Sequence, residues 1–226
     1  MPSAALTARV HAGFLAFVGD ERFSCLAGKG VVHRGAYTLR VYSALGSADT
    51  APALGSDLAA FVARPPATRD GFTTFVAVFT GRAPRSEGAF ERRLWTQLQL
   101  LHGGDDAGWD PTVSADTDDP RFSFSFASQA FFVVGLHPKS SRITRRFRWP
   151  ALVFNPRRQF DQLRADGRFD RLRTAIRERE IALQGSINPT LADFGVRSEA
   201  RQYSGRAAEP EWRCPFHARP RDADGA

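Results

Sequence analysis

The residues with the clearest capacity for chemistry lie where an apolar segment ends in a histidine. The sequence reads FFVVGLHPKSSR over residues 131–142, so large apolar side chains lead directly to His137, and Arg142, Arg145 and Arg146 follow closely. A neutral imidazole can ligate iron, and guanidinium groups can bind carboxylates such as the propionates of heme. The same pattern also fits a hydrogen-bonded histidine at the end of a strand, followed by solvated arginines. The residues alone favour that simpler structural interpretation.

A second group of polar residues lies between residues 184 and 206. Asn188 precedes a proline, and Gly195 and Gly205 follow, which is typical of turns. Asp193 and Glu199 could simply pair with arginines. Alternatively, the segment forms the wall of a polar pocket in which the two carboxylates bind a guanidinium through charge-assisted hydrogen bonds. The sequence leaves both interpretations open.

The two cysteines, Cys25 and Cys214, lie far apart in the sequence, and each has aromatic neighbours. Such cysteines are most often inert core thiols, and a thiolate ligand to heme iron is the alternative. Two cysteines do not make the disulfide framework of a small secreted protein. A bond between them remains open, although a reducing compartment disfavours it.

An α+β fold must position these residues. Apolar residues at helical spacing predict helices that begin near Ser3 and Asp57, that include residues 90–101, and that run from residue 160 to 183 with a break near Gly167. Aromatic and β-branched runs predict strands at residues 37–45, 72–79, 122–126, 130–136 and 151–154. Because helices and strands do not alternate regularly, we expect one domain over residues 1–217, with a mixed or largely antiparallel sheet packed with helices. We expect residues 218–226 to form a disordered tail.

Composition and charge narrow the class of protein. The chain has 226 residues and a formal net charge of +7, and its positive charge comes almost wholly from arginine. A basic protein can bind nucleic acid, but a bias towards arginine also follows from a GC-rich genome, so we give nucleic-acid binding little weight. The sequence shows no secretory signal peptide and no apolar run near the ~20 residues that span a bilayer. We therefore expect a cytoplasmic protein that is not embedded in a membrane.

Together these segments resemble the YqcI/YcgG family, which includes heme-dependent N-hydroxylases of guanitoxin and D-cycloserine biosynthesis. The resemblance runs from about residue 14 to residue 217 and rests on the order and spacing of short motifs. These are FSC at 23–25, FSFSF at 122–126, FFVVGLHPKSSR at 131–142, RRF at 145–147, LVFN at 152–155, QF at 159–160, LQGSINP at 183–189, DFG at 193–195, SEARQYSGR at 198–206 and WRCPF at 212–216. Two positions depart from the family. Its FPC motif has lost the proline here, and the histidine that members often carry after VFN is absent from residues 155–159.

The resemblance implies an enzyme, a heme-dependent monooxygenase. It would use heme b iron and dioxygen to hydroxylate a guanidino nitrogen of arginine or of an arginine-derived amino acid. The sequence has no flavin or iron–sulfur motif, so the electrons would come from an external donor. The alternatives are a non-catalytic heme-binding or gas-sensing protein and, with less support, an arginine-rich nucleic-acid-binding module. The sequence does not predict the oligomeric state.

The resemblance also suggests roles for particular residues. Because the histidine after VFN is missing, we expect His137 to be the iron ligand, with Cys25 and Cys214 as the alternatives. Phe132 is expected to pack against the porphyrin, and the heme propionates are expected to bind Arg142, Arg145 and Arg146. We expect the cationic substrate to be held by Asn188, Asp193 and Glu199.

Overall fold

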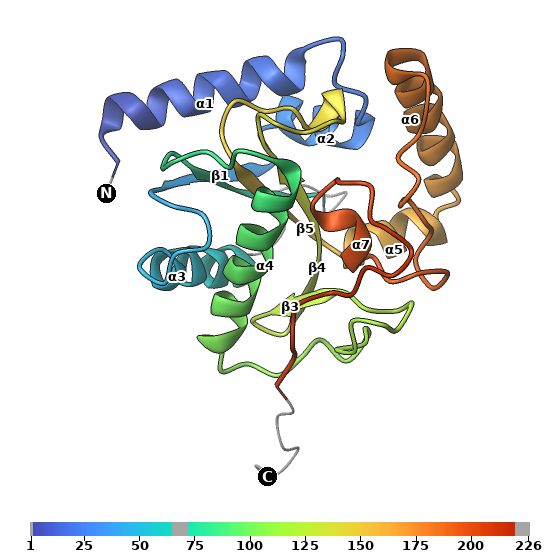
Figure 1. Cartoon of the computed structure of the whole chain (residues 1–226). Helices are drawn as coiled ribbons and strands as arrows, with labels where there is room; N and C mark the ends of the chain where they lie inside the picture. Colours follow the sequence, from blue (N-terminus) through green and yellow to red (C-terminus); the bar gives the residue numbers. More distant parts are fainter. Residues whose placement is uncertain (1, 65–71, 220–226) are drawn as a thin grey trace.

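A five-stranded mixed sheet forms the centre of the computed structural model, which describes residues 2–64 and 72–219 (Figure 1). Its strand order is β1-β2-β5-β4-β3. The strands are β1 Tyr37–Tyr42, β2 Thr74–Phe79, β3 Phe124–Phe126, β4 Gln129–Leu136 and β5 Ala151–Pro156. β1 and β2 are parallel, and the other neighbouring pairs are antiparallel. The predicted α+β class and the largely antiparallel sheet are confirmed. Most of the predicted tail, residues 220–226, lies outside the described residues.

Helices cover both faces of the sheet. On one face, α3 (Ala51–Val62) and α4 (Glu87–Gly103) pack on an aromatic core, to which α7 (Ala200–Tyr203) also contributes. On the other face, α1 (Ala4–Gly19) packs on a smaller apolar cluster. Figure 1 shows α1 and α2 together along one side of the molecule and α6 standing at its edge. No helix in the described part of the chain is long and apolar enough to cross a membrane.

Some helices follow directly from the sequence, and one does not. Ser3 caps α1, as predicted, because its side chain accepts a hydrogen bond from the backbone N–H of Leu6. The helix α2 (Leu26–His33) was not predicted, because Gly28 and Gly30 lower its helix propensity. Cys25 caps α2, and a Cβ atom added to Gly28 would lie only 3.2 Å from the ring of Phe23. The glycine therefore allows the helix to pack closely on the aromatic residue that precedes it.

Successive residues of β4 point to opposite faces of the sheet, as the period of a strand requires. Phe131 and Val133 belong to the core on the α4 face. A Cβ atom added to Gly135 would lie 2.5 Å from the ring of Phe90 in α4, so glycine is needed for the helix to approach the strand. The even-numbered residues of β4 point to the opposite face, where α1, α2 and α6 lie.

The outer helices α5 (Arg158–Ala165) and α6 (Phe169–Gln184) are separated by Gly167, which adopts a left-handed conformation with φ of 66°. This confirms the predicted break in the helical stretch. The helix α6 buries a single side chain, that of Glu180. Contact with the rest of the molecule therefore depends on a carboxylate and on partly buried apolar residues such as Ile176.

Candidate functional site

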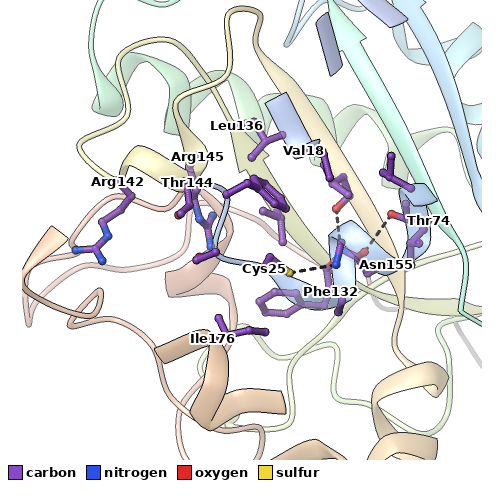
Figure 2. A pocket seen from close by; sticks show the side chains of 18 of the residues that line it. Val18, Cys25, Thr74, Phe132, Leu136, Arg142, Thr144, Arg145, Asn155 and Ile176 are labelled. Atoms are coloured by element: carbon purple, nitrogen blue, oxygen red, sulfur yellow. Dashed lines mark hydrogen bonds between the residues drawn. The ribbon is translucent and has the colours of Figure 1, made fainter. Parts of the chain in front are cut away.

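A cavity of about 280 Å³ lies between the sheet and the helices α1, α2, α5 and α6 (Figure 2). Its volume is just below the roughly 300–1,000 Å³ typical of small-molecule sites. Its walls are mainly apolar and include Phe14 and Val18 from α1, Phe132 and Val134 from β4, and Ile176 from α6. A small number of polar groups enter this apolar space, which is the usual composition of a ligand-binding cavity.

Cys25 brings a thiol to the cavity wall at the N-terminus of α2. Its Sγ accepts a hydrogen bond from the backbone N–H of Gly28 at 3.4 Å. Burial raises the pKa of the thiol, although the N–H groups at the start of the helix and the charge of Arg145 act in the opposite direction. The thiol is therefore protonated at neutral pH unless a cation or a metal binds it, since a metal ion deprotonates a coordinating thiol.

Glu180 brings a carboxylate to the same cavity and connects α6 to two other segments of the chain. Its oxygens accept hydrogen bonds from the hydroxyl of Ser24 at 2.5 Å, the hydroxyl of Thr144 at 2.7 Å and the guanidinium of Arg142 at 2.6 Å. Burial alone would raise the pKa of Glu180, but these three hydrogen bonds hold it below its ordinary value. Glu180 is therefore ionised at neutral pH, and it fixes the residue next to Cys25.

The three arginines expected to act together are separated by the structure. Arg142 lines the cavity, but it is paired with Glu180. Arg146 is exposed and donates to backbone carbonyls, and it does not line the cavity. Arg145 lines the cavity, and its Nη1 donates to the backbone carbonyl of Tyr203 at 3.1 Å. In Figure 2 the guanidinium of Arg145 lies between the guanidinium of Arg142 and the thiol of Cys25.

His137 does not line this cavity, and its expected role as an iron ligand stays a prediction. The odd-numbered face of β4 continues to His137, whose ring stacks on that of Phe90 with centroids 4.2 Å apart. The side chain is completely buried, and neither ring nitrogen has a hydrogen-bond partner among the described residues. Burial lowers the pKa of His137 to about 4, so its imidazole is neutral at physiological pH.

Cys214 also lies outside the cavity, in the aromatic core on the α4 face. Burial raises the pKa of its thiol to about 12. Both cysteines are free, so no disulfide joins Cys25 and Cys214. Asn188 does line the cavity, but its Nδ2 donates to the carbonyl of Gly205 and its Oδ1 accepts two hydrogen bonds from Thr190. Its amide therefore holds the turn that the Asn-Pro sequence predicts.

The two carboxylates expected to bind a cationic substrate are already paired within the protein. Asp193 pairs with Arg173 and Arg177, and it does not line the cavity. Glu199 is buried on the α4 side, where its oxygens accept from two hydroxyl groups and from Arg157 at 2.7 Å. The structure thus supports the simpler alternative for both residues, in which they pair with arginines.

Glu180 and Ser24 are among the cavity residues that sequence reasoning missed. The signal for Glu180 was its spacing, because it follows Ile176 by four residues and therefore shares the face of α6 that points inward. On a surface helix, charged residues normally lie on the face opposite the apolar one, so a carboxylate on the apolar face is unusual. No comparable signal marked Ser24, because its role depends on a hydrogen bond to Glu180, which is distant in the sequence.

Comparison with known proteins identifies relatives of the chain. The model of the YqcI/YcgG family matches residues 14–217, a range that includes every residue lining the cavity. The chain is 31% identical over 134 residues to a Bacillus subtilis (strain 168) protein described as uncharacterized protein YcgG. That match covers 57% of this chain and 53% of the relative, so the chain spans about half the length of the curated relative it matches. No solved structure matches the chain.

Proposed function

Because the chain belongs to the YqcI/YcgG family, we propose that it is a heme-dependent monooxygenase that hydroxylates a guanidino nitrogen of arginine or of an arginine-derived amino acid. The observation that carries this proposal is an apolar cavity with a thiol in its wall, contained within the range that the family model matches. A bound heme b would supply the oxidation chemistry, with dioxygen and with electrons from an external donor.

The donor set of the cavity suits heme iron, and the walls would have to move apart beyond the present 280 Å³ to admit the whole macrocycle. Cys25 is the group in the cavity wall that can ligate iron most strongly, since thiolates are established heme ligands. Ligation would remove the thiol proton, and the N–H groups at the start of α2 would stabilise the resulting thiolate. We therefore propose Cys25 as the iron ligand in place of His137, which lies behind β4, and of Cys214, which lies in the opposite core.

The remaining walls would exclude water and orient the substrate. Phe132 and its apolar neighbours line the cavity and would provide a surface for the porphyrin. Among the described residues, Glu180 is the one carboxylate that lines the cavity. We therefore propose that Glu180, rather than Asp193 or Glu199, faces the guanidino end of the substrate. Ser24, Thr144 and Arg142 occupy three of the roughly four acceptor positions of this carboxylate, which leaves about one for the substrate.

The proposal is tested by absorption spectroscopy of the purified protein, oxidised and then reduced under carbon monoxide. We expect a heme Soret band and a ferrous–carbon monoxide band at the position typical of thiolate-ligated heme. Cys25→Ala should lose heme or shift that band. Cys214→Ala is the matched control, because it removes a buried thiol on the other face of the sheet and should leave the spectrum unchanged.

Activity is then measured with a chemical reductant, dioxygen and a panel of guanidines, and we expect an N-hydroxylated product. A protein that binds no heme, either as purified or after addition of hemin, would refute the proposal. Heme binding without any product would favour the non-catalytic alternative. If His137→Phe rather than Cys25→Ala removed the heme, the assignment of the iron ligand would be wrong.

A further inference from the structure

Arg145 is a partly buried cation that forms no salt bridge with a carboxylate of the described residues. Its guanidinium lines the apolar cavity, and its one hydrogen bond within the described part of the chain is that from Nη1 to the carbonyl of Tyr203. No ion pair among residues 2–64 and 72–219 includes it. Burial lowers the pKa of Arg145 to about 10, which still leaves it charged at neutral pH. Several of its N–H groups are therefore free to bind an acceptor in the cavity.

Other arginines in protected positions are paired. Arg142 pairs with Glu180 at 2.6 Å, Arg157 pairs with Glu199 at 2.7 Å, and Arg206 pairs with a carboxylate of α4 at 2.9 Å. These pairs follow the general rule that a charge removed from water needs a partner of opposite charge. Arg142 and Arg145 both line the cavity, and of these two only Arg145 departs from that rule.

The protein holds this guanidinium in a fixed position. Gly205 adopts a left-handed conformation with φ of 81°, and a Cβ atom there would lie 2.5 Å from Cδ and 3.0 Å from Nε of Arg145. The side chain thus packs directly against the backbone of Gly205, while the Tyr203 carbonyl fixes one of its nitrogens. Such a guanidinium loses little conformational freedom when it binds a planar anion.

We propose that Arg145 is the carboxylate-binding residue of the cavity. A carboxylate matches the single unpaired positive charge, whereas a phosphate would carry close to two negative charges into an apolar space. The carboxylate can come from a heme propionate or from the amino-acid substrate, and the choice of these two sources rests on the proposed function. The structure assigns to Arg145 alone a role that the sequence suggested for Arg142 and Arg146 as well.

Two pairs of probes distinguish the sources. The first pair is hemin and hemin dimethyl ester, in which the propionates are esterified, and binding is followed by absorbance. The second pair is L-arginine and agmatine, which carry the same guanidino group with and without a carboxylate, and binding is followed by calorimetry. We expect the wild-type protein to prefer the carboxylate-bearing member of at least one pair by roughly tenfold or more. That comparison needs no variant.

Variants then assign the preference to Arg145. Arg145→Gln should abolish it, and Arg145→Lys should retain part of it because the charge remains. Gly205→Ala should also reduce it, since the added Cβ displaces the guanidinium without removing its charge. Arg146→Gln is the matched control, because that exposed neighbour lies outside the cavity and should leave the preference unchanged.

The inference would be overturned if the wild-type protein distinguished neither pair, or if Arg145→Gln kept the preference. Its failure is separable from failure of the proposed function. If hemin binds but neither pair is distinguished, the heme proposal survives and the role of Arg145 is wrong. If hemin does not bind, the heme proposal fails, and the comparison of L-arginine with agmatine still decides the role of Arg145.

Discussion

Acidification should destabilise the protein through His137. The ring is completely buried against Phe90, and burial lowers its pKa from an ordinary value of 6.5 to about 4. The nearby carboxylate of Glu87 favours the charged form, and the charge of Arg145 disfavours it, but burial is the larger effect. Because the unfolded state takes up the proton first, the stability contributed by the neutral ring is present above pH 6.5. It is lost as the pH falls from 6.5 towards 4.

The size of this effect follows from the difference between the two pKa values. That difference is 6.5 minus about 4, or about 2.5. Each pKa unit corresponds to about 1.4 kcal/mol, so the full loss is about 3 kcal/mol. This is a large part of the 5–15 kcal/mol that is typical of the free energy of unfolding of a folded domain.

The assay is urea-induced unfolding between pH 7.5 and about 4. The variant His137→Phe keeps an aromatic ring on Phe90 and cannot be protonated, so its stability should fall with acidification by about 3 kcal/mol less than that of the wild-type protein. The control is His33→Gln, which removes an exposed histidine and should follow the wild-type curve. Carboxylates contribute acid sensitivity to all three proteins, so the difference between the curves isolates His137. Parallel curves for the wild-type protein and His137→Phe would refute this reasoning.

Two further predictions concern packing and accessibility. Gly135→Ala should lower the free energy of unfolding by about 1–3 kcal/mol, because its Cβ atom would lie 2.5 Å from the Phe90 ring. Gly19→Ala adds the same atom where nothing lies within 4 Å and should not lower it, so equal losses in the two variants would contradict the packing described. Under native conditions iodoacetamide should modify Cys25 before Cys214, as followed by mass spectrometry, because Cys25 lines the cavity and Cys214 is buried. Hemin should protect Cys25, and modification at the same rate with hemin present would count against its role as the iron ligand.

The fold was largely predictable because its strands and main helices carry strong patterns. Residues 72–79 and 130–136 correspond closely to β2 and β4. The helix predicted from Asp57 begins earlier, at Ala51, because Pro52 is acceptable in the first turn of a helix. The helix α2 was missed because its sequence contains two glycines, and its stability comes from contacts that are distant in sequence.

The candidate site was less predictable, and the reasons are physical. Phe132 and His137 were expected to contact the same heme, but they are five residues apart on one extended segment, and an odd separation along a strand places side chains on opposite faces. The sequence contained that information. The partners of Asp193 and Glu199 depend on how the C-terminal segment lies against the sheet, and no local pattern records that arrangement.

The manner in which α6 is attached has a consequence for how ligands reach the cavity. Its one buried side chain is an ionised glutamate held by three hydrogen bonds, and its apolar contacts, such as those of Phe169 and Leu172, are only partly buried. Segments of this kind open locally at a lower free energy than the whole molecule, and their amide hydrogens exchange earlier. Ile176 of α6 points into the cavity, so a ligand that fills the space gives the helix an apolar partner. Ligand occupancy and protection of α6 against exchange should therefore rise together.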